Sequence, residues 1–180
     1  MELFKGRPAD VSDRSEKEIR VYDFLDELEI DYWRLDHASA FGSEVELCRE
    51  IEESLGARIC KNLFLANRQR SKFYMLMIPE YKAFRSSDIS KQAGSSRLHF
   101  AESEYMEELI ECLPGSASVM GLINDTEHRV QLLVDYDVIS SEYVGCHPCI
   151  NTSSLRIRSE DIFNKFIKAT GHDYIVVHAE

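Results

Sequence analysis

The sequence predicts a single α+β domain with three layers, in which helices cover a central, mixed and mostly antiparallel β-sheet. Its 180 residues suffice for one well-buried core and barely for two. Segments typical of strands outnumber helical segments and occur mostly as hairpins, with the helices interspersed among them. With 44% hydrophobic and 29% charged residues, the composition is that of an ordinary globular protein.

The N-terminal residues 1–14 show little pattern, and we expect them to form a loosely held arm before one domain over residues 15–180. Ser15, with an acidic residue three positions later, predicts the start of a first helix that ends near Leu28. The alternating segment 31–36 predicts a strand.

A second helix is expected from a cap at Ser43 through Leu55, with Gly56 ending it. The segment 60–79 then predicts a β-hairpin, because two apolar runs flank a short polar tip. Its second run is apolar at every position from 73 to 78, which is typical of a strand covered on both faces. The hairpin is therefore expected at the centre of the sheet.

The remaining elements follow from shorter apolar segments. They are helices over 87–92, about 103–112 and 159 to about 170, and strands over 97–101, 120–123, 130–135, 143–147, 153–157 and 174–177. Gly171 is expected to end the last helix.

Charge is distributed unevenly along the chain. The net charge is −11, yet residues 58–97 contain nine basic and only two acidic side chains, so the other residues carry −18. Such a segment indicates one of two things. Either it forms a positive patch that binds a polyanion on an otherwise acidic protein, or it is basic only because most acidic residues lie in helices and this segment has few helices. The overall charge disfavours a general DNA-binding protein.

The sequence has no apolar run of membrane-spanning length, and its first residues lack the apolar region of a signal peptide. Its five cysteines, an odd number, favour a reducing compartment over a disulfide framework. We therefore expect a cytoplasmic protein with no membrane partner.

Lys61 is the first candidate functional residue. It lies at the head of the first hairpin strand, where burying an ammonium group without a partner is costly. Either its stem covers apolar surface while its head reaches water, or it presents its charge to a carbonyl, carboxylate or phosphate in a cleft. Asn62 beside it adds an amide that donates and accepts hydrogen bonds.

Residues 115–121, which we call the small-residue loop, read Gly-Ser-Ala-Ser-Val-Met-Gly. Small side chains let backbone N–H groups approach a ligand and bind a carbonyl oxygen or a developing oxyanion, although such loops are also common as plain turns. His147, before Pro148, is a candidate base, a donor to substrate, or a core histidine.

The spacing of Cys146 and Cys149 is typical of a redox pair or half of a zinc site. No second pair of ligands appears at a suitable distance, and we expect no metal and no cofactor. Motifs of serine hydrolases, zinc proteases and nucleotide-binding loops are also absent from the sequence.

Four segments together resemble the freestanding prolyl-tRNA editing proteins, relatives of the editing domain inserted in bacterial prolyl-tRNA synthetase. They are Lys61-Asn62-Leu63-Phe64-Leu65, residues 115–125 ending in Asn124-Asp125, residues 146–155 beginning Cys146-His147-Pro148-Cys149, and Gly171-His172-Asp173. The likeness extends over roughly residues 15–178 and is greatest to the Ala-tRNA(Pro) deacylase branch.

The resemblance implies a carboxylic ester hydrolase, an aminoacyl-tRNA deacylase that releases alanine from mischarged Ala-tRNA(Pro). Lys61, Gly115 and His147 would be catalytic. Substrate would also contact Asn62, Ser116, Ala117, Ser118, Val119, Asn151 and Thr152, and tRNA would contact Arg68, Arg70, Lys72 and Arg85. The expected partners are the acceptor end of tRNA(Pro) and prolyl-tRNA synthetase.

An aminoacyl ester is already labile, so positioning a water and stabilising the oxyanion suffice without a nucleophilic side chain. In related editing domains the terminal ribose hydroxyl assists the water, and no side chain is assigned as general base. Val119 stands where the family usually has proline, which leaves the loop freer. The alternatives are a Cys-tRNA(Pro) deacylase and a non-catalytic tRNA-binding or regulatory module of the same fold.

Overall fold

The computed structural model describes residues 1–39 and 45–180 and confirms the α+β class. Its strands are β1 (Leu3–Lys5), β2 (Tyr32–Asp36), β3 (Cys60–Ala66), β4 (Phe73–Pro79), β5 (His99–Phe100), β6 (Val130–Asp135), β7 (Tyr143–Cys146), β8 (Ser153–Arg158) and β9 (Tyr174–Val177). Its helices are α1 (Glu16–Glu27), α2 (Val45–Leu55), α3 (Ser86–Gln92), α4 (Ser103–Ile110), the 3-10 helix η1 (Val119–Asn124), α5 (Tyr136–Ile139) and one C-terminal helix made of α6 (Ser159–Asp161), the π-helical turn η2 (Ile162–Phe166) and α7 (Ile167–Ala169).

The larger sheet has five strands in the order β5-β3-β4-β6-β9. The pairs β3–β4 and β3–β5 are antiparallel, and the pairs β4–β6 and β6–β9 are parallel. All seven residues of β4 are buried, as its uninterrupted apolar sequence predicted. The hairpin of β3 and β4 is therefore at the centre of this sheet.

The strands form two sheets instead of the single central sheet that we expected. The second sheet has the order β1-β2-β8-β7 and is antiparallel throughout. The two sheets meet at an isolated bridge between Ile59 and Gly145. A Cβ atom at Gly145 would lie 2.8 Å from the carbonyl oxygen of Arg58, so only glycine allows this approach.

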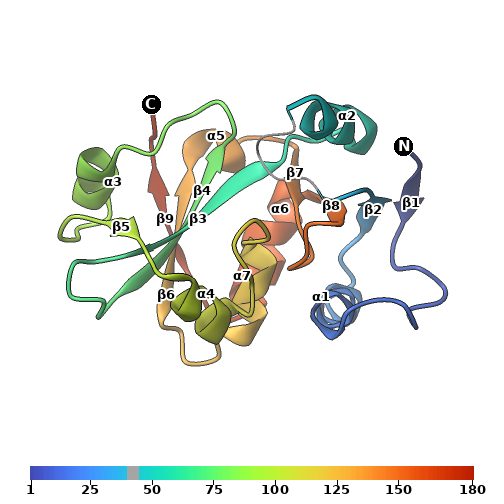
Figure 1. The fold of residues 1–180 in the computed structure, drawn as a ribbon, viewed down its shortest axis with the longest axis horizontal. Helices are drawn as coiled ribbons and strands as arrows, with labels where there is room; N and C mark the ends of the chain where they lie inside the picture. The colour runs from blue at the N-terminus through green and yellow to red at the C-terminus, as the bar shows by residue number, and fades with distance from the viewer. Residues whose placement is uncertain (40–44) are drawn as a thin grey trace.

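The helices cover these sheets on several sides (Figure 1). One face of the five-stranded sheet packs with α1, η1 and the C-terminal helix in the largest hydrophobic cluster, and its other face packs against α3. Helix α2 covers the four-stranded sheet by burying Ile51 and Leu55 against Leu35. Within the described residues, no helix combines the length and apolar character needed to cross a membrane.

The first residues do not form the loosely held arm that we expected. Strand β1 pairs with β2, and the side chain of Arg14 makes two hydrogen bonds of 2.9 and 2.8 Å to the carboxylate of Asp36. Arg14 also contacts the buried carboxylate of Glu18 at 3.1 Å. These contacts join residues that have no sequence periodicity of their own, which is why the pattern did not reveal them.

The strand predicted over residues 120–123 is wrong, because this segment forms the 3-10 helix η1. The side chain of Ser118 caps it by accepting a hydrogen bond from the Met120 N–H at 3.1 Å. Gly121 packs so tightly against α4 that a Cβ atom there would lie 2.7 Å from the Ile110 carbonyl oxygen. The expected cap of α2, Ser43, lies outside the described residues.

Candidate functional site

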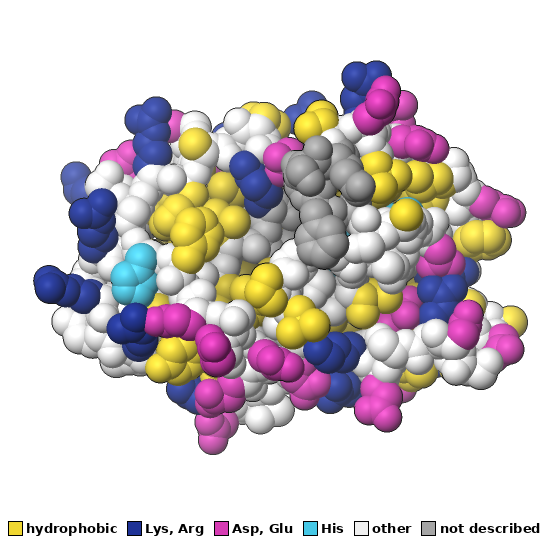
Figure 2. Space-filling model, viewed as in Figure 1, with side chains coloured by type: hydrophobic (Ala, Val, Ile, Leu, Met, Phe, Trp, Pro, Cys, Tyr) yellow, Lys and Arg dark blue, Asp and Glu magenta, His cyan; other side chains and the backbone are white. Residues whose placement is uncertain are grey.

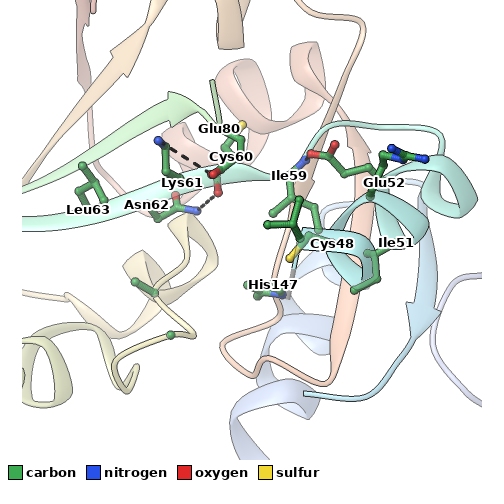
Figure 3. A pocket seen from close by; sticks show the side chains of 14 residues that line it. Cys48, Ile51, Glu52, Ile59, Cys60, Lys61, Asn62, Leu63, Glu80 and His147 are labelled. Carbon is green, nitrogen blue, oxygen red and sulfur yellow. Dashed lines mark hydrogen bonds and ion pairs between the residues drawn. The ribbon is translucent and has the colours of Figure 1, made fainter. Parts of the chain in front are cut away.

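A pocket of about 470 Å³ lies where the two sheets meet. The start of β3 and helix α2 form two of its walls, and the small-residue loop and the turn after β7 contribute the rest (Figure 3). Lys61, Asn62, Gly115, Ala117 and His147 all line it. The structure therefore brings together five of the predicted site residues, which come from three separate parts of the chain.

The ammonium group of Lys61 lies at the rim of this pocket. Its Nζ donates a hydrogen bond of 2.8 Å to the carbonyl oxygen of Lys82 and lies 3.9 Å from a carboxylate oxygen of Glu80. The side chain points toward Glu80 and away from His147 (Figure 3). Because it is one-third exposed, the ammonium group can turn toward a ligand without leaving a buried charge unpaired.

Asn62 lies on the opposite face of β3 from Lys61, since side chains alternate along a strand. Its amide donates to the Cys60 carbonyl oxygen at 3.1 Å, while its own Oδ1 is buried without a partner among the described residues. Strand β5 pairs with β3 at Leu65 and Ala66, so within the described part of the chain no strand neighbours this edge of β3 at Asn62. The pocket lies along this open edge.

The small-residue loop supplies two backbone donors. Gly115 has a φ of +87°, which glycine adopts without strain. The turn is closed by a hydrogen bond of 2.9 Å from the Ser116 N–H to the Leu113 carbonyl oxygen. The N–H groups of Gly115 and Ala117 have no partner in the part of the chain that the structure describes, and both residues line the pocket. They are suited to bind a carbonyl oxygen or an anion.

Ser118 and Val119, two predicted substrate contacts, are fully buried and do not line the pocket. The hydroxyl of Ser118 donates to the His147 carbonyl oxygen and at the same time caps η1. Val119 is the first residue of η1, a position that also suits proline because its N–H needs no partner within the helix. Both residues therefore fix the loop instead of touching a ligand.

His147 lines the pocket and uses one of its two ring nitrogens in a hydrogen bond to the backbone. Its Nδ1 donates to the Ser153 carbonyl oxygen at 2.9 Å, which leaves Nε2 as an acceptor without a partner among the described residues. Burial lowers the pKa of His147 below its usual value of 6.5, and the nearby His37 lowers it further. The imidazole is therefore neutral at pH 7 and can accept a hydrogen bond or a proton.

Three other predicted contacts lie elsewhere. Ser116 and Asn151 line a neighbouring pocket, and the hydroxyl of Ser116 is already hydrogen-bonded to the Leu113 backbone. Thr152 is exposed, and its carbonyl oxygen accepts from the His37 N–H at 3.0 Å. The structure places none of the three in the pocket of Lys61.

The cysteines of the C-x-x-C segment do not form an isolated pair. Cys149 donates a hydrogen bond to Cys112, which follows α4, and this bond raises the pKa of Cys149 and lowers that of Cys112. Burial raises the pKa of Cys146 as well. No group of three or more His, Cys, Asp or Glu side chains arranged to hold a metal occurs within the described residues.

The four predicted tRNA contacts are exposed but lie away from the pocket. Arg68, Arg70 and Lys72 occupy the tip of the hairpin, the opposite end of β3 from Lys61. Arg70 forms an ion pair with Glu102, and Arg85 forms one with Glu180 at 2.9 Å. Seven residues separate Lys61 from Arg68, or roughly 23 Å along an extended strand.

Sequence reasoning missed the wall of the pocket that α2 provides. Cys48 and Ile51 of this helix face the pocket together with Ile59, and they make its floor apolar (Figure 3). In the sequence, Ile51 belonged only to the apolar pattern of the expected second helix, and nothing about Cys48 or Ile59 indicated a pocket. Cys60 also lines the pocket, and burial raises the pKa of its thiol to about 12, so it is protonated and a poor nucleophile at pH 7.

Comparisons with known proteins converge on one family. The family model described as the aminoacyl-tRNA editing domain matches residues 43–165. The chain is 25% identical over 150 residues to the prolyl-tRNA editing protein ProX of Acetoanaerobium sticklandii, covering 83% of this chain and 90% of that protein. It is 30% identical over 148 residues to prolyl-tRNA synthetase associated domain-containing protein 1 of Mus musculus, covering 80% and 85% of the two chains.

The fold is also found among solved structures. A protein described as "a putative trans-editing enzyme for prolyl tRNA synthetase" superposes with a TM-score of 0.68 at 15% identity, covering 92% of this chain and 98% of that one. At this level of identity the likeness concerns the fold. It agrees with the mixed, two-sheet α+β architecture described above.

Proposed function

The chain belongs to the aminoacyl-tRNA editing domain family, and from this premise we propose that it is a cytoplasmic trans-editing enzyme that hydrolyses mischarged Ala-tRNA(Pro). The products would be alanine and uncharged tRNA(Pro). The printed names of the relatives mention prolyl-tRNA editing and association with prolyl-tRNA synthetase, which supports tRNA(Pro) and this synthetase as partners.

One observation carries the proposal. Gly115, Ala117, His147 and Lys61 all line one pocket with an apolar floor, and among the described residues the Gly115 and Ala117 amides and the His147 Nε2 atom have no partner. These groups suit an uncharged ester attached to a polyanion: the amides bind the carbonyl oxygen, and the ammonium at the rim binds a phosphate or the terminal ribose.

The reaction needs no covalent enzyme intermediate. The oxygen of a water molecule attacks the ester carbonyl carbon. The electrons of the carbonyl double bond move onto the carbonyl oxygen, where the Gly115 and Ala117 amides stabilise the negative charge. The bond to the ribose oxygen then breaks, and that oxygen takes up the proton that the water lost. Neutral His147 orients the substrate or the water through its Nε2 lone pair.

Alanine would be selected by size, if the amino-acid side chain binds in a part of the pocket that is too narrow for the ring of proline. Serine and cysteine differ from alanine by one atom, and a pocket separates such pairs only modestly. The direct test is release of labelled amino acid from Ala-, Cys-, Ser- and Pro-tRNA(Pro). Alanine released no faster than in buffer would reject the proposal.

We expect the rate on Ala-tRNA(Pro) to depend on the protonation of His147. Because the pKa of His147 lies below 6.5, the neutral imidazole, which is the active form, predominates from pH 8 down to about pH 6.5. The rate should fall only when the pH drops through the lowered pKa and the imidazole becomes protonated. Rates corrected for spontaneous hydrolysis between pH 5 and 8 measure this. His147→Gln should be about 10- to 100-fold slower and lack the acid limb; an unchanged profile would remove His147 from the mechanism.

A specific observation also favours a second candidate, a non-catalytic tRNA-binding or regulatory module. The Lys61 ammonium is hydrogen-bonded to the Lys82 carbonyl oxygen and points away from His147 (Figure 3). Such a module would bind tRNA(Pro) with a strongly salt-dependent affinity but release no amino acid. Measuring binding and turnover on the same preparation separates the two candidates.

A further inference from the structure

An apolar surface continues from the pocket through Leu63, which also lines the pocket. It consists of Leu63, Phe84 and Phe100, which we call the aromatic surface. Phe100 is 62% exposed, and its ring meets that of Phe84 edge to face with centroids 5.6 Å apart. Leu63 and Phe84 pack at the margin of the hydrophobic cluster beneath α3. Figure 2 shows hydrophobic side chains gathered on this face of the molecule.

The register of the sheet aligns the aromatic surface with Lys61. Phe100 is paired with Leu65 across β3 and β5, so the two side chains lie on the same face. Lys61 and Leu63 share that face because side chains alternate along β3. Four residues separate Lys61 from Leu65, which is about 13 Å along the strand. The surface thus begins at the rim of the pocket and extends away from it.

Basic side chains border the aromatic surface. Arg85 follows Phe84 directly, Arg97 precedes β5, and Arg70 approaches the end of β5 through its ion pair with Glu102. Arg97 and Lys91 are exposed and form no ion pair with any residue that the structure describes. Exposed aromatic rings framed by cations are suited to single-stranded nucleic acid, whose bases stack on the rings while its phosphates contact the cations.

We propose that the aromatic surface stacks the unpaired nucleotides that precede the 3′-terminal nucleotide of the RNA substrate. This inference rests on the proposed function, since the terminal nucleotide must carry its ester into the pocket. A length of 13 Å accommodates about four nucleotides at roughly 3.4 Å each. Phe100 would carry most of the stacking, because its ring is the most exposed of the three side chains.

The test measures binding of uncharged RNA, which does not depend on hydrolysis. A hairpin that reproduces the tRNA(Pro) acceptor stem, with and without its unpaired 3′ nucleotides, is titrated by fluorescence anisotropy. Phe100→Ala should weaken binding of the complete hairpin roughly 5- to 100-fold, as expected for loss of one base–aromatic stack. Phe100→Trp should restore it, since tryptophan also offers a ring for stacking.

The truncated hairpin gives the decisive comparison. Wild-type protein and Phe100→Ala should bind it equally, because the nucleotides that stack on Phe100 are missing. Phe4→Ala is the matched control: Phe4 is 39% exposed on β1 of the other sheet, and its replacement should leave both affinities unchanged.

Equal binding of the complete hairpin by Phe100→Ala and wild type would overturn the inference. An equal loss of affinity for the truncated hairpin would also overturn it. The same holds if Phe100→Ala loses affinity only for a protein, such as the synthetase or a second copy of the chain. If the wild type binds the hairpin through Phe100 but releases no alanine, the hydrolase proposal fails and the stacking surface stands. If the wild type releases alanine but Phe100→Ala binds the complete hairpin normally, the stacking inference fails and the hydrolase proposal stands.

Discussion

Replacing Lys61 by alanine is expected to slow alanine release from Ala-tRNA(Pro) about 100- to 1,000-fold, the loss typical of removing one charge-stabilising donor from an active site. Together with a second cationic side chain, Arg49, Lys61 lines the same pocket as Gly115 and Ala117. Its ammonium is held by the Lys82 carbonyl oxygen at 2.8 Å, and we expect it to exchange this neutral acceptor for an anionic group of the substrate.

Two further variants identify the cause of the loss. Lys61→Met keeps the apolar stem but removes the charge, so it should be as slow as Lys61→Ala if the ammonium is what matters. Lys72→Ala is the matched control, because it removes an equal charge at the hairpin tip, far from the pocket. It should change the rate at saturating tRNA less than twofold and reduce the salt dependence of binding slightly. A Lys61→Met protein with near-normal turnover would exclude a catalytic ammonium.

The central hairpin and the α+β class could be predicted because local signals were strong. The uninterrupted apolar run of β4 and the polar tip before it leave few alternatives, and the capping serine of α1 marks its start. The division into two sheets could not be predicted, because it depends on which strands pair at long range. The bridge between Ile59 and Gly145 joins residues 86 positions apart in the sequence.

The site was only partly predictable for a similar reason. Lys61, Gly115 and His147 stand out by residue type, and the fold brings them to one pocket. Ser118 also stood out, but burial and its bond to the His147 carbonyl oxygen make it a structural residue. Sequence spacing likewise pointed to Cys146 as the neighbour of Cys149, whereas the hydrogen-bond partner of Cys149 is Cys112.

Asp125 and His172, in two of the segments that suggested the family, form a buried structural link instead of a site. The carboxylate of Asp125 accepts hydrogen bonds from the N–H groups of Arg129 at 3.0 Å and Val130 at 2.8 Å, and lies 2.9 Å from His172 Nε2. Asp125 is 3% exposed and His172 is 9% exposed. This link holds the end of η1 against the start of β6 and the segment before β9.

Asp125→Ala should therefore lower the free energy of unfolding by about 3 to 5 kcal/mol, because it leaves the buried Val130 N–H, the partly buried Arg129 N–H and the buried imidazole of His172 without their acceptor. For a chain of this size, that corresponds to a fall in Tm of roughly 6 to 20 °C. Urea unfolding followed by circular dichroism measures the change.

Asp173→Ala is the control, since this neighbouring carboxylate is exposed and, among the described residues, accepts a hydrogen bond from Gln131 alone, at 3.2 Å. Its effect should stay within about 0.5 kcal/mol, as for most surface substitutions. Because Asp125 does not line the pocket, alanine release by the Asp125→Ala protein that remains folded should be close to normal at low temperature. If Asp125→Ala instead loses turnover severely without losing stability, Asp125 takes part in the reaction. If Asp125→Ala and Asp173→Ala are destabilised equally, the burial and hydrogen bonds of Asp125 are not what stabilises the fold.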